Sequence, residues 1–253
     1  MKTKTRPRLS RISALHYVKL AYRSALFLAA AAVYVRNRIL RTGRPFGGLE
    51  SRVPLLLLIW LVFAAEMVLR FFPSGQESMG CQKQFACNYI PAASGEKGSA
   101  APVSSARATA AVALSWLALN GVLGALYLTG VWDAGIMLLI SLAFSVCDMV
   151  CILFFCPFQT WFLKNKCCVT CRIYNWDYAM MFTPLLFVRS LLGWSLLALS
   201  LVLLAKWEIL CRLHPERFSE AENASLSCAS CREKLCQHKT QLRRFQRRHR
   251  LLS

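Results

Sequence analysis

The sequence predicts an all-α fold, a polytopic bundle of transmembrane helices followed by a cysteine-containing C-terminal tail. Of the 253 residues, 56% are hydrophobic, which exceeds the roughly 45–50% of ordinary soluble domains. A helix needs about 20 apolar residues to cross a bilayer. Four apolar runs have about this length and are the predicted core spans: Val53–Phe72, Thr109–Val131, Ala134–Phe155 and Ala179–Ala205.

Positive charge is concentrated outside these runs. The net charge is +19, and Lys and Arg crowd into Lys2–Arg52 and Lys206–Arg250. Basic flanks on apolar spans follow the positive-inside rule and attract anionic headgroups. The distribution favours a lipid bilayer with anionic headgroups as the partner, and it argues against nucleic acid. We expect an integral protein of the plasma or inner membrane with both termini cytoplasmic.

Residues 1–52 form a basic N-terminal segment that contains one further apolar stretch, Ala25–Val35. This stretch is too short to span a bilayer by itself. It is either an interfacial helix or a short fifth span whose basic flanks snorkel to the surface. Charge favours the interfacial helix, because a fifth span would leave one strongly basic segment outside.

The remaining chain divides into a bundle and a tail. Residues 53–205 form the predicted bundle, which carries cysteine-bearing loops at residues 73–108 and 157–178. Residues 206–253 form a basic, cysteine-rich cytoplasmic tail. With four spans and both termini inside, both cysteine-bearing loops are expected outside, on the side opposite to the tail.

Four polar residues interrupt the apolar runs, and ionisable groups at such depth usually face the interior of a bundle. An ion pair of Arg189 with Asp148 or Glu66 is expected, although Glu66 could instead pair with Arg70 along one helix. Such a polar layer either fixes helix packing or forms a quinone, proton or ion site. The candidate cofactor-binding residues are Glu66, Asn120, Asp148 and Arg189.

The predicted outer loops contain two cysteine pairs that are candidate catalytic groups. Cys168 and Cys171 form a CxxC motif, whose spacing suits a disulfide or one metal ion. Nearby cations lower the pKa of such thiols. Cys81 and Cys87 lie in the other loop, on the same expected face.

This layout resembles membrane thiol oxidoreductases of the vitamin K epoxide reductase type. The resemblance implies a four-helix bundle with a loop cysteine pair after its first core span, where Cys81 and Cys87 stand. It also implies a CxxC motif before the last span, where Cys168 and Cys171 stand. A quinone would contact a polar residue of the second core helix, the position of Asn120.

The tail holds a third group of cysteines. Three cysteines within nine residues of a polar, basic segment indicate metal binding in a reducing cytoplasm. Zinc or an iron–sulfur cluster needs four ligands. The candidate ligands are Cys228, Cys231, Cys236, Cys211 and His238.

Three functions remain open from the sequence, and whether the chain is an enzyme depends on the choice among them. The first is a membrane protein for thiol–disulfide exchange or electron transfer that uses the outer cysteines and a quinone. The second is a non-enzymatic membrane adaptor, whose metal-held tail binds an unidentified protein partner. The third is a small ion- or proton-coupled transporter that uses the buried carboxyl groups.

Overall fold

The computed structural model describes residues 10–39, 54–74, 80–92, 106–163, 171–231, 235–236 and 239–240. Within these ranges the chain is mostly helical and has no strand beyond a single isolated bridge. The long helices are α1 (Arg11–Ile39), α2 (Pro54–Leu69), α4 (Ala106–Leu128), α5 (Ala134–Leu153) and α7 (Leu191–Leu213). The short helical segments are α3 (Gly80–Lys83), η2 (Ala86–Asn88), η3 (Phe158–Leu163), η5 (Arg172–Trp176), α6 (Asp177–Phe182), η6 (Thr183–Phe187), η7 (Pro215–Arg217) and η8 (Ala224–Leu226).

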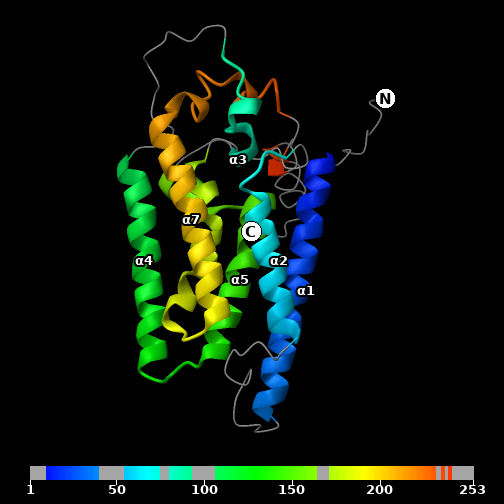
Figure 1. Cartoon of the computed structure of the whole chain (residues 1–253), viewed down its shortest axis with the longest axis vertical. Helices are drawn as coiled ribbons and strands as arrows, with labels where there is room; N and C mark the ends of the chain where they lie inside the picture. The colour runs from blue at the N-terminus through cyan, green and yellow to red at the C-terminus, as the bar shows by residue number, and fades with distance from the viewer. Residues whose placement is uncertain are drawn as a thin grey trace.

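Three of the four predicted apolar runs form apolar helices. Of the described helices, α1, α4 and α5 are long and apolar enough to cross a membrane, and α2 is a shorter apolar helix. The long helices lie side by side in one bundle (Figure 1). We call the end where α1 begins the upper end, and the end where α1 finishes the lower end.

Helix α1 runs antiparallel to α5 along its length. Near the upper end, the rings of Tyr17 and Phe154 meet edge to face with centroids 6.2 Å apart. Near the lower end, the Tyr34 hydroxyl donates a hydrogen bond of 2.9 Å to Asp133. The carboxylate of Asp133 also caps the first turn of α5.

The apolar stretch Ala25–Val35 does not form a short helix of its own. This stretch lies inside α1, which is 29 residues long. The predicted apolar stretch began only after Arg23, because a charged side chain normally marks the end of a span. The structure buries Arg23 completely, so the helix continues through it toward the upper end.

The predicted span Ala179–Ala205 is also corrected, because it is not one helix. Helix α6 ends at Phe182 and η6 ends at Phe187, before α7 begins at Leu191. The Ser190 side chain caps α7 by accepting a hydrogen bond from the Gly193 backbone. The chain therefore runs from the upper to the lower end through η5, α6 and η6, which we call the descending segment. It then returns to the upper end as α7.

The close contact of η6 with α4 shows how far the descending segment reaches. A Cβ atom on Gly124 would lie 2.4 Å from the Phe187 ring, so only a residue without a side chain fits there. Gly124 is near the lower end of α4. The descending segment thus runs most of the length of the bundle.

The loops and the tail consequently lie at the same end. Two backbone hydrogen bonds join the tail to the segment after α3, Ala224 N to Ile90 O at 2.8 Å and Ala92 N to Glu222 O at 3.0 Å. The expectation that the cysteine-bearing loops lie opposite the tail is therefore wrong. Its error comes from the descending segment, which the prediction joined to α7 as a single helix.

Candidate functional site

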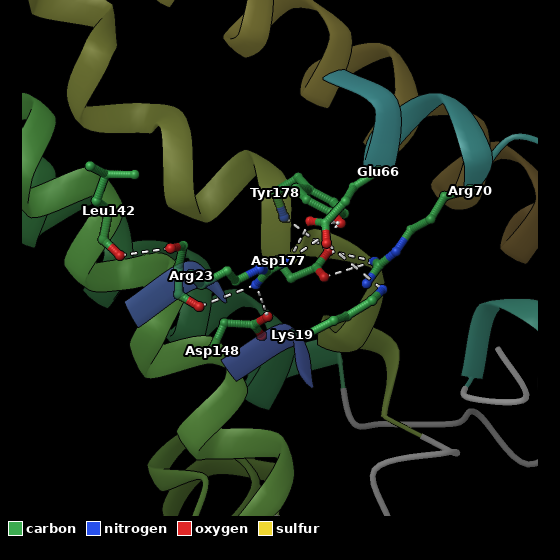
Figure 2. A network of polar contacts seen from close by, with 9 residues as sticks. Lys19, Arg23, Glu66, Arg70, Leu142, Asp148, Asp177 and Tyr178 are labelled. Atoms are coloured by element: carbon green, nitrogen blue, oxygen red, sulfur yellow. Dashed lines mark hydrogen bonds and ion pairs between the residues drawn. The ribbon is translucent and has the colours of Figure 1, made fainter. Parts of the chain in front are cut away.

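A cluster of buried ion pairs lies toward the upper end of the bundle, and Arg23 of α1 is at its centre (Figure 2). The fully buried Arg23 guanidinium donates to Glu66 Oε2 on α2 at 2.7 Å and to Asp148 Oδ2 on α5 at 3.1 Å. It also donates to the Ser145 carbonyl oxygen at 3.1 Å. One cation thus joins three helices through charge-assisted hydrogen bonds, which are stronger than neutral ones.

Two further groups support the Glu66 carboxylate. The Tyr178 hydroxyl on α6 donates to Glu66 Oε2 at 2.9 Å, and Lys19 Nζ lies 3.9 Å from Oε1. Lys19 and Arg23 are four residues apart, so they share one face of α1. The cluster therefore fixes α6 as well as the three long helices.

A second ion pair lies beside the first. Arg70 Nη1, just after α2, is 2.9 Å from Asp177 Oδ1 and 2.7 Å from Oδ2, and both side chains are buried. The guanidinium also lies over the rings of Tyr174 and Tyr178, at 5.2 and 4.6 Å from their centroids. The described cluster balances three cations with three carboxylates: Lys19, Arg23 and Arg70 with Glu66, Asp148 and Asp177.

Of the four residues of the predicted polar layer, the structure brings two together and places the other two elsewhere. Glu66 and Asp148 do come together. Arg189 is not their partner, because it is exposed in the turn before α7 at the lower end. Asn120 is buried elsewhere on α4, where its side chain donates to the Trp116 carbonyl at 2.9 Å. Sequence reasoning missed Arg23, although its spacing from Lys19 was the available signal.

A cavity of about 130 Å³ lies against this cluster, between α4, α5, η3, η5 and α6. Asp148 and Asp177 belong to both, since each pairs with an arginine and also lines the cavity. The walls are otherwise mostly apolar, with Trp116, Phe144, Ile152, Phe158, Met180 and Met181. Four cysteines line the same cavity: Cys147, Cys151, Cys156 and Cys171.

Two of these cysteines are neighbours. Cys151, on the last turns of α5, and Cys156, which follows the helix, lie close enough for their thiols to influence each other's ionisation. Both are thiols rather than a disulfide. The Cys156 sulfur also accepts a hydrogen bond from the Gln159 backbone N–H at 3.4 Å.

These contacts make Cys156 an unusually acidic thiol. The pKa of Cys156 is lowered to about 6, chiefly by the interaction with Cys151, although desolvation by burial would raise it. Backbone N–H groups and the positive charge of Lys239 contribute in the same direction. Since the thiolate is the nucleophilic form of cysteine, Cys156 is the reactive thiol that this geometry favours.

Of the predicted catalytic cysteines, Cys171 lines the cavity, whereas Cys168 lies outside the described residues. Cys81 is buried in α3, and Cys87 is an exposed free thiol, so these two do not form a disulfide. The sequence analysis did not single out Cys151 and Cys156. The available signal was two cysteines at the end of an apolar helix, five residues apart.

The predicted tail metal site stays a prediction. Cys228 and Cys236 are exposed, Cys231 is partly exposed, and Cys211 lies on α7. His238 lies outside the described residues. Within the described ranges, no three His, Cys, Asp or Glu side chains are arranged to hold a metal ion.

Comparisons with protein-family models, with curated proteins and with solved structures give no match to this chain. The function is therefore argued from the cavity and its neighbouring ion pairs.

Proposed function

We propose that the chain is an integral membrane protein that carries out thiol–disulfide chemistry at the cysteine-lined cavity. Cys156 is the attacking thiolate and Cys151 is the second, resolving thiol. The observation that carries the proposal is that these two interacting thiols line the wall of one cavity.

Membrane insertion is supported by the outer surfaces of the long helices. Large apolar side chains are exposed along them and have no partner within the bundle, as expected for a surface that faces lipid. Helix α4 alone exposes Leu114, Leu117, Leu119, Val122 and Leu128.

The proposed reaction is a balanced exchange. The Cys156 thiolate attacks one sulfur of a disulfide, forms a mixed disulfide and expels the other sulfur as a thiolate. Cys151 loses its proton and attacks Cys156, which closes the Cys151–Cys156 disulfide and releases the second substrate thiol. Two electrons pass to the substrate, and the reverse sequence oxidises a dithiol.

A quinone is the proposed alternative partner for the same two electrons. Two thiols then yield one disulfide, two protons and two electrons, and the quinone becomes a quinol. The aromatic and apolar cavity walls suit such a ring. The buried indole N–H of Trp116, which has no hydrogen-bond partner among the described residues, is a suitable donor to a quinone carbonyl. Asp148 lines this cavity as expected, whereas Asn120 and Arg189 do not.

The ion-pair cluster has a positioning role in this proposal. Arg23 holds the carboxylate of Asp148. Asp148 directly follows Cys147 in α5 and precedes Cys151 by three residues. Arg70 holds Asp177 on the opposite wall. With both carboxylates paired to arginines, the cavity presents its sulfur atoms without unpaired acid groups.

A redox titration of the purified protein tests the proposal. The protein is equilibrated with mixtures of reduced and oxidised dithiothreitol, alkylated and analysed by peptide mass spectrometry. We expect a disulfide between Cys151 and Cys156 that appears in one two-electron step, and a Cys87→Ser variant that behaves like the parent. The proposal is wrong if these two cysteines stay reduced or pair with other partners.

A further inference from the structure

The order of the crossings makes the two ends of the bundle very different in charge. Among the described residues, the upper end holds the start of α1, the end of α2, α3, the start of α4, the end of α5, η5 and the segment that follows α7. The lower end holds the end of α1, the start of α2 and two short turns, at residues 129–133 and 188–190.

The basic residues divide unequally between these ends. Of the 31 Lys and Arg residues, Lys19, Arg23 and Arg70 belong to the buried cluster. Six belong to the lower end: Arg36, Arg38, Arg41, Arg44, Arg52 and Arg189. In the sequence, all the others precede α1, follow α7, lie between α2 and α4 or between α5 and α6, or stand toward the upper ends of α1, α4 and α7.

Described side chains at the upper end are placed to meet lipid headgroups. Arg11, Arg107 and Arg212 are exposed at the upper ends of α1, α4 and α7. At the lower end, Arg38 is partly neutralised, because its guanidinium lies 3.5 Å from Asp133. Basic residues close to the ends of spans decide which end stays in the cytoplasm, since Lys and Arg are translocated poorly.

We infer that the upper end, with the cysteine-lined cavity, faces the cytoplasm and the anionic lipid leaflet on that side. This orientation retains both termini in the cytoplasm and moves the cysteine-bearing loops there as well. The short lower turns, which are easily translocated, face outside.

The inference deepens the proposed function by naming the compartment of its partner. Thiols in the cytoplasm are kept reduced by the soluble thiol pool. Cys151 and Cys156 would therefore rest as a dithiol and exchange with cytoplasmic disulfides, rather than with substrates outside the membrane. This detail depends on the proposed thiol chemistry, whereas the orientation itself depends only on the charge distribution and the crossings.

Cysteine labelling in spheroplasts of a bacterial host tests the orientation. The reagent is a membrane-impermeant maleimide, and labelled peptides are identified by mass spectrometry with and without detergent. Exposed Cys87 and Cys228 report on the upper end. A Val131→Cys variant reports on the lower turn, where Val131 is 65% exposed. The parent chain is the matched control for this introduced thiol.

We expect Val131→Cys to be labelled in intact spheroplasts, and Cys87 and Cys228 to be labelled at least tenfold more after detergent is added. Labelling of Cys87 and Cys228 in intact spheroplasts overturns the inference. So does a Val131→Cys thiol that reacts only after detergent treatment. The redox titration of purified protein does not depend on orientation, so the two proposals fail separately.

Discussion

The acidity of Cys156 depends on a small number of neighbours. The Cys151 thiol interacts with its sulfur, two backbone N–H groups point toward it, and Lys239 from the tail adds a positive charge. Lys239 is held in place by a hydrogen bond of 3.2 Å from its ammonium group to the Cys151 carbonyl. These neighbours lower the pKa of Cys156 below that of an ordinary cysteine, which is about 8.5.

The Cys151→Ala substitution tests the largest of these contributions. Removing the donor raises the pKa of Cys156 toward its ordinary value, so fewer molecules carry the thiolate near pH 6.5. We expect iodoacetamide to alkylate Cys156 about tenfold more slowly at this pH. In the parent chain the rate should rise through about pH 6 and then level off. Mass spectrometry of the Cys156 peptide gives the rates.

Cys147→Ala is the matched control, because Cys147 lies on the same helix and lines the same cavity without donating to Cys156. Equal slowing by both alanine variants would mean that a general change in the cavity, and not the Cys151 thiol, sets the reactivity.

The lowered pKa of Cys156 also affects the stability of the protein. Above the ordinary thiol pKa, the ionised Cys156 stabilises the folded state. That contribution is lost as the pH falls through about 6.

The Arg23→Met substitution tests the buried cluster. It leaves Glu66 and Asp148 without their cation, and breaking a buried pair in this way costs about 3–5 kcal/mol. We therefore expect a large fall in the thermal unfolding temperature in detergent. Arg189→Met is the control, because that side chain is exposed at the lower end. Similar melting temperatures for the two variants would contradict the structural role of Arg23.

At the scale of the elements, the sequence analysis located helices correctly where turn residues separate one apolar run from the next. The predicted runs Thr109–Val131 and Ala134–Phe155 match α4 and α5 to within three residues at each end. The turn between them contains Gly130, whose φ of 76° suits glycine. The prediction failed where tertiary contacts override local pattern, in the burial of Arg23 within α1.

The candidate site shows the same limit. The sequence identified Glu66 and Asp148 as deep polar residues, because charges inside apolar runs are conspicuous. It could not identify their partner, since Arg23 and Arg189 each border an apolar run and only packing distinguishes them. Pro184 and Ser190 were visible signals for the break before α7, but the apolar run continues across both.

The contact between α4 and η6 can be tested with one pair of glycine substitutions. A Cβ atom at Gly124 would overlap the Phe187 ring, whereas nothing lies within 4 Å of a Cβ atom at Gly121. We expect Gly124→Ala to destabilise the protein by about 1–3 kcal/mol. Gly121→Ala should be neutral or stabilising by up to about 1 kcal/mol, because alanine favours the helix. Thermal unfolding of both variants measures the difference, and equal stability would place η6 away from α4.

The attachment of the tail to the bundle depends on one side chain. Asn223 is fully buried, and its amide donates to the carbonyl oxygens of Lys83 at 3.2 Å and Arg217 at 2.9 Å. Its Oδ1 accepts from the Ser225 hydroxyl at 2.6 Å.

The Asn223→Ala substitution should free the tail. Leaving these buried partners unsatisfied costs about 1–3 kcal/mol, so we expect amide hydrogen exchange in residues 218–231 to accelerate about tenfold or more. Glu220→Ala, at an exposed position in the same segment, should leave exchange unchanged. Unaltered protection in Asn223→Ala would show that the tail is held by other contacts, such as buried Phe218 and Leu226.

At the scale of the whole molecule, the bundle brings a reactive thiol pair, a neutral ion-pair cluster and a docked tail together at one end. Each part comes from a different region of the chain: Arg23 from α1, Cys151 from α5 and Lys239 from the tail. The central claim is that this end of the bundle supports exchange through Cys156 with Cys151 as the resolving thiol.

The most direct test is to trap the mixed disulfide with the Cys151→Ser variant of the full chain. The purified protein is treated with glutathione disulfide, and glutathione attached to Cys156 is measured by mass spectrometry. The account predicts that glutathione accumulates on Cys156 in Cys151→Ser, whereas in the parent chain it is released as the Cys151–Cys156 disulfide forms. Equal modification of Cys156 in both proteins, or no modification in either, would contradict it.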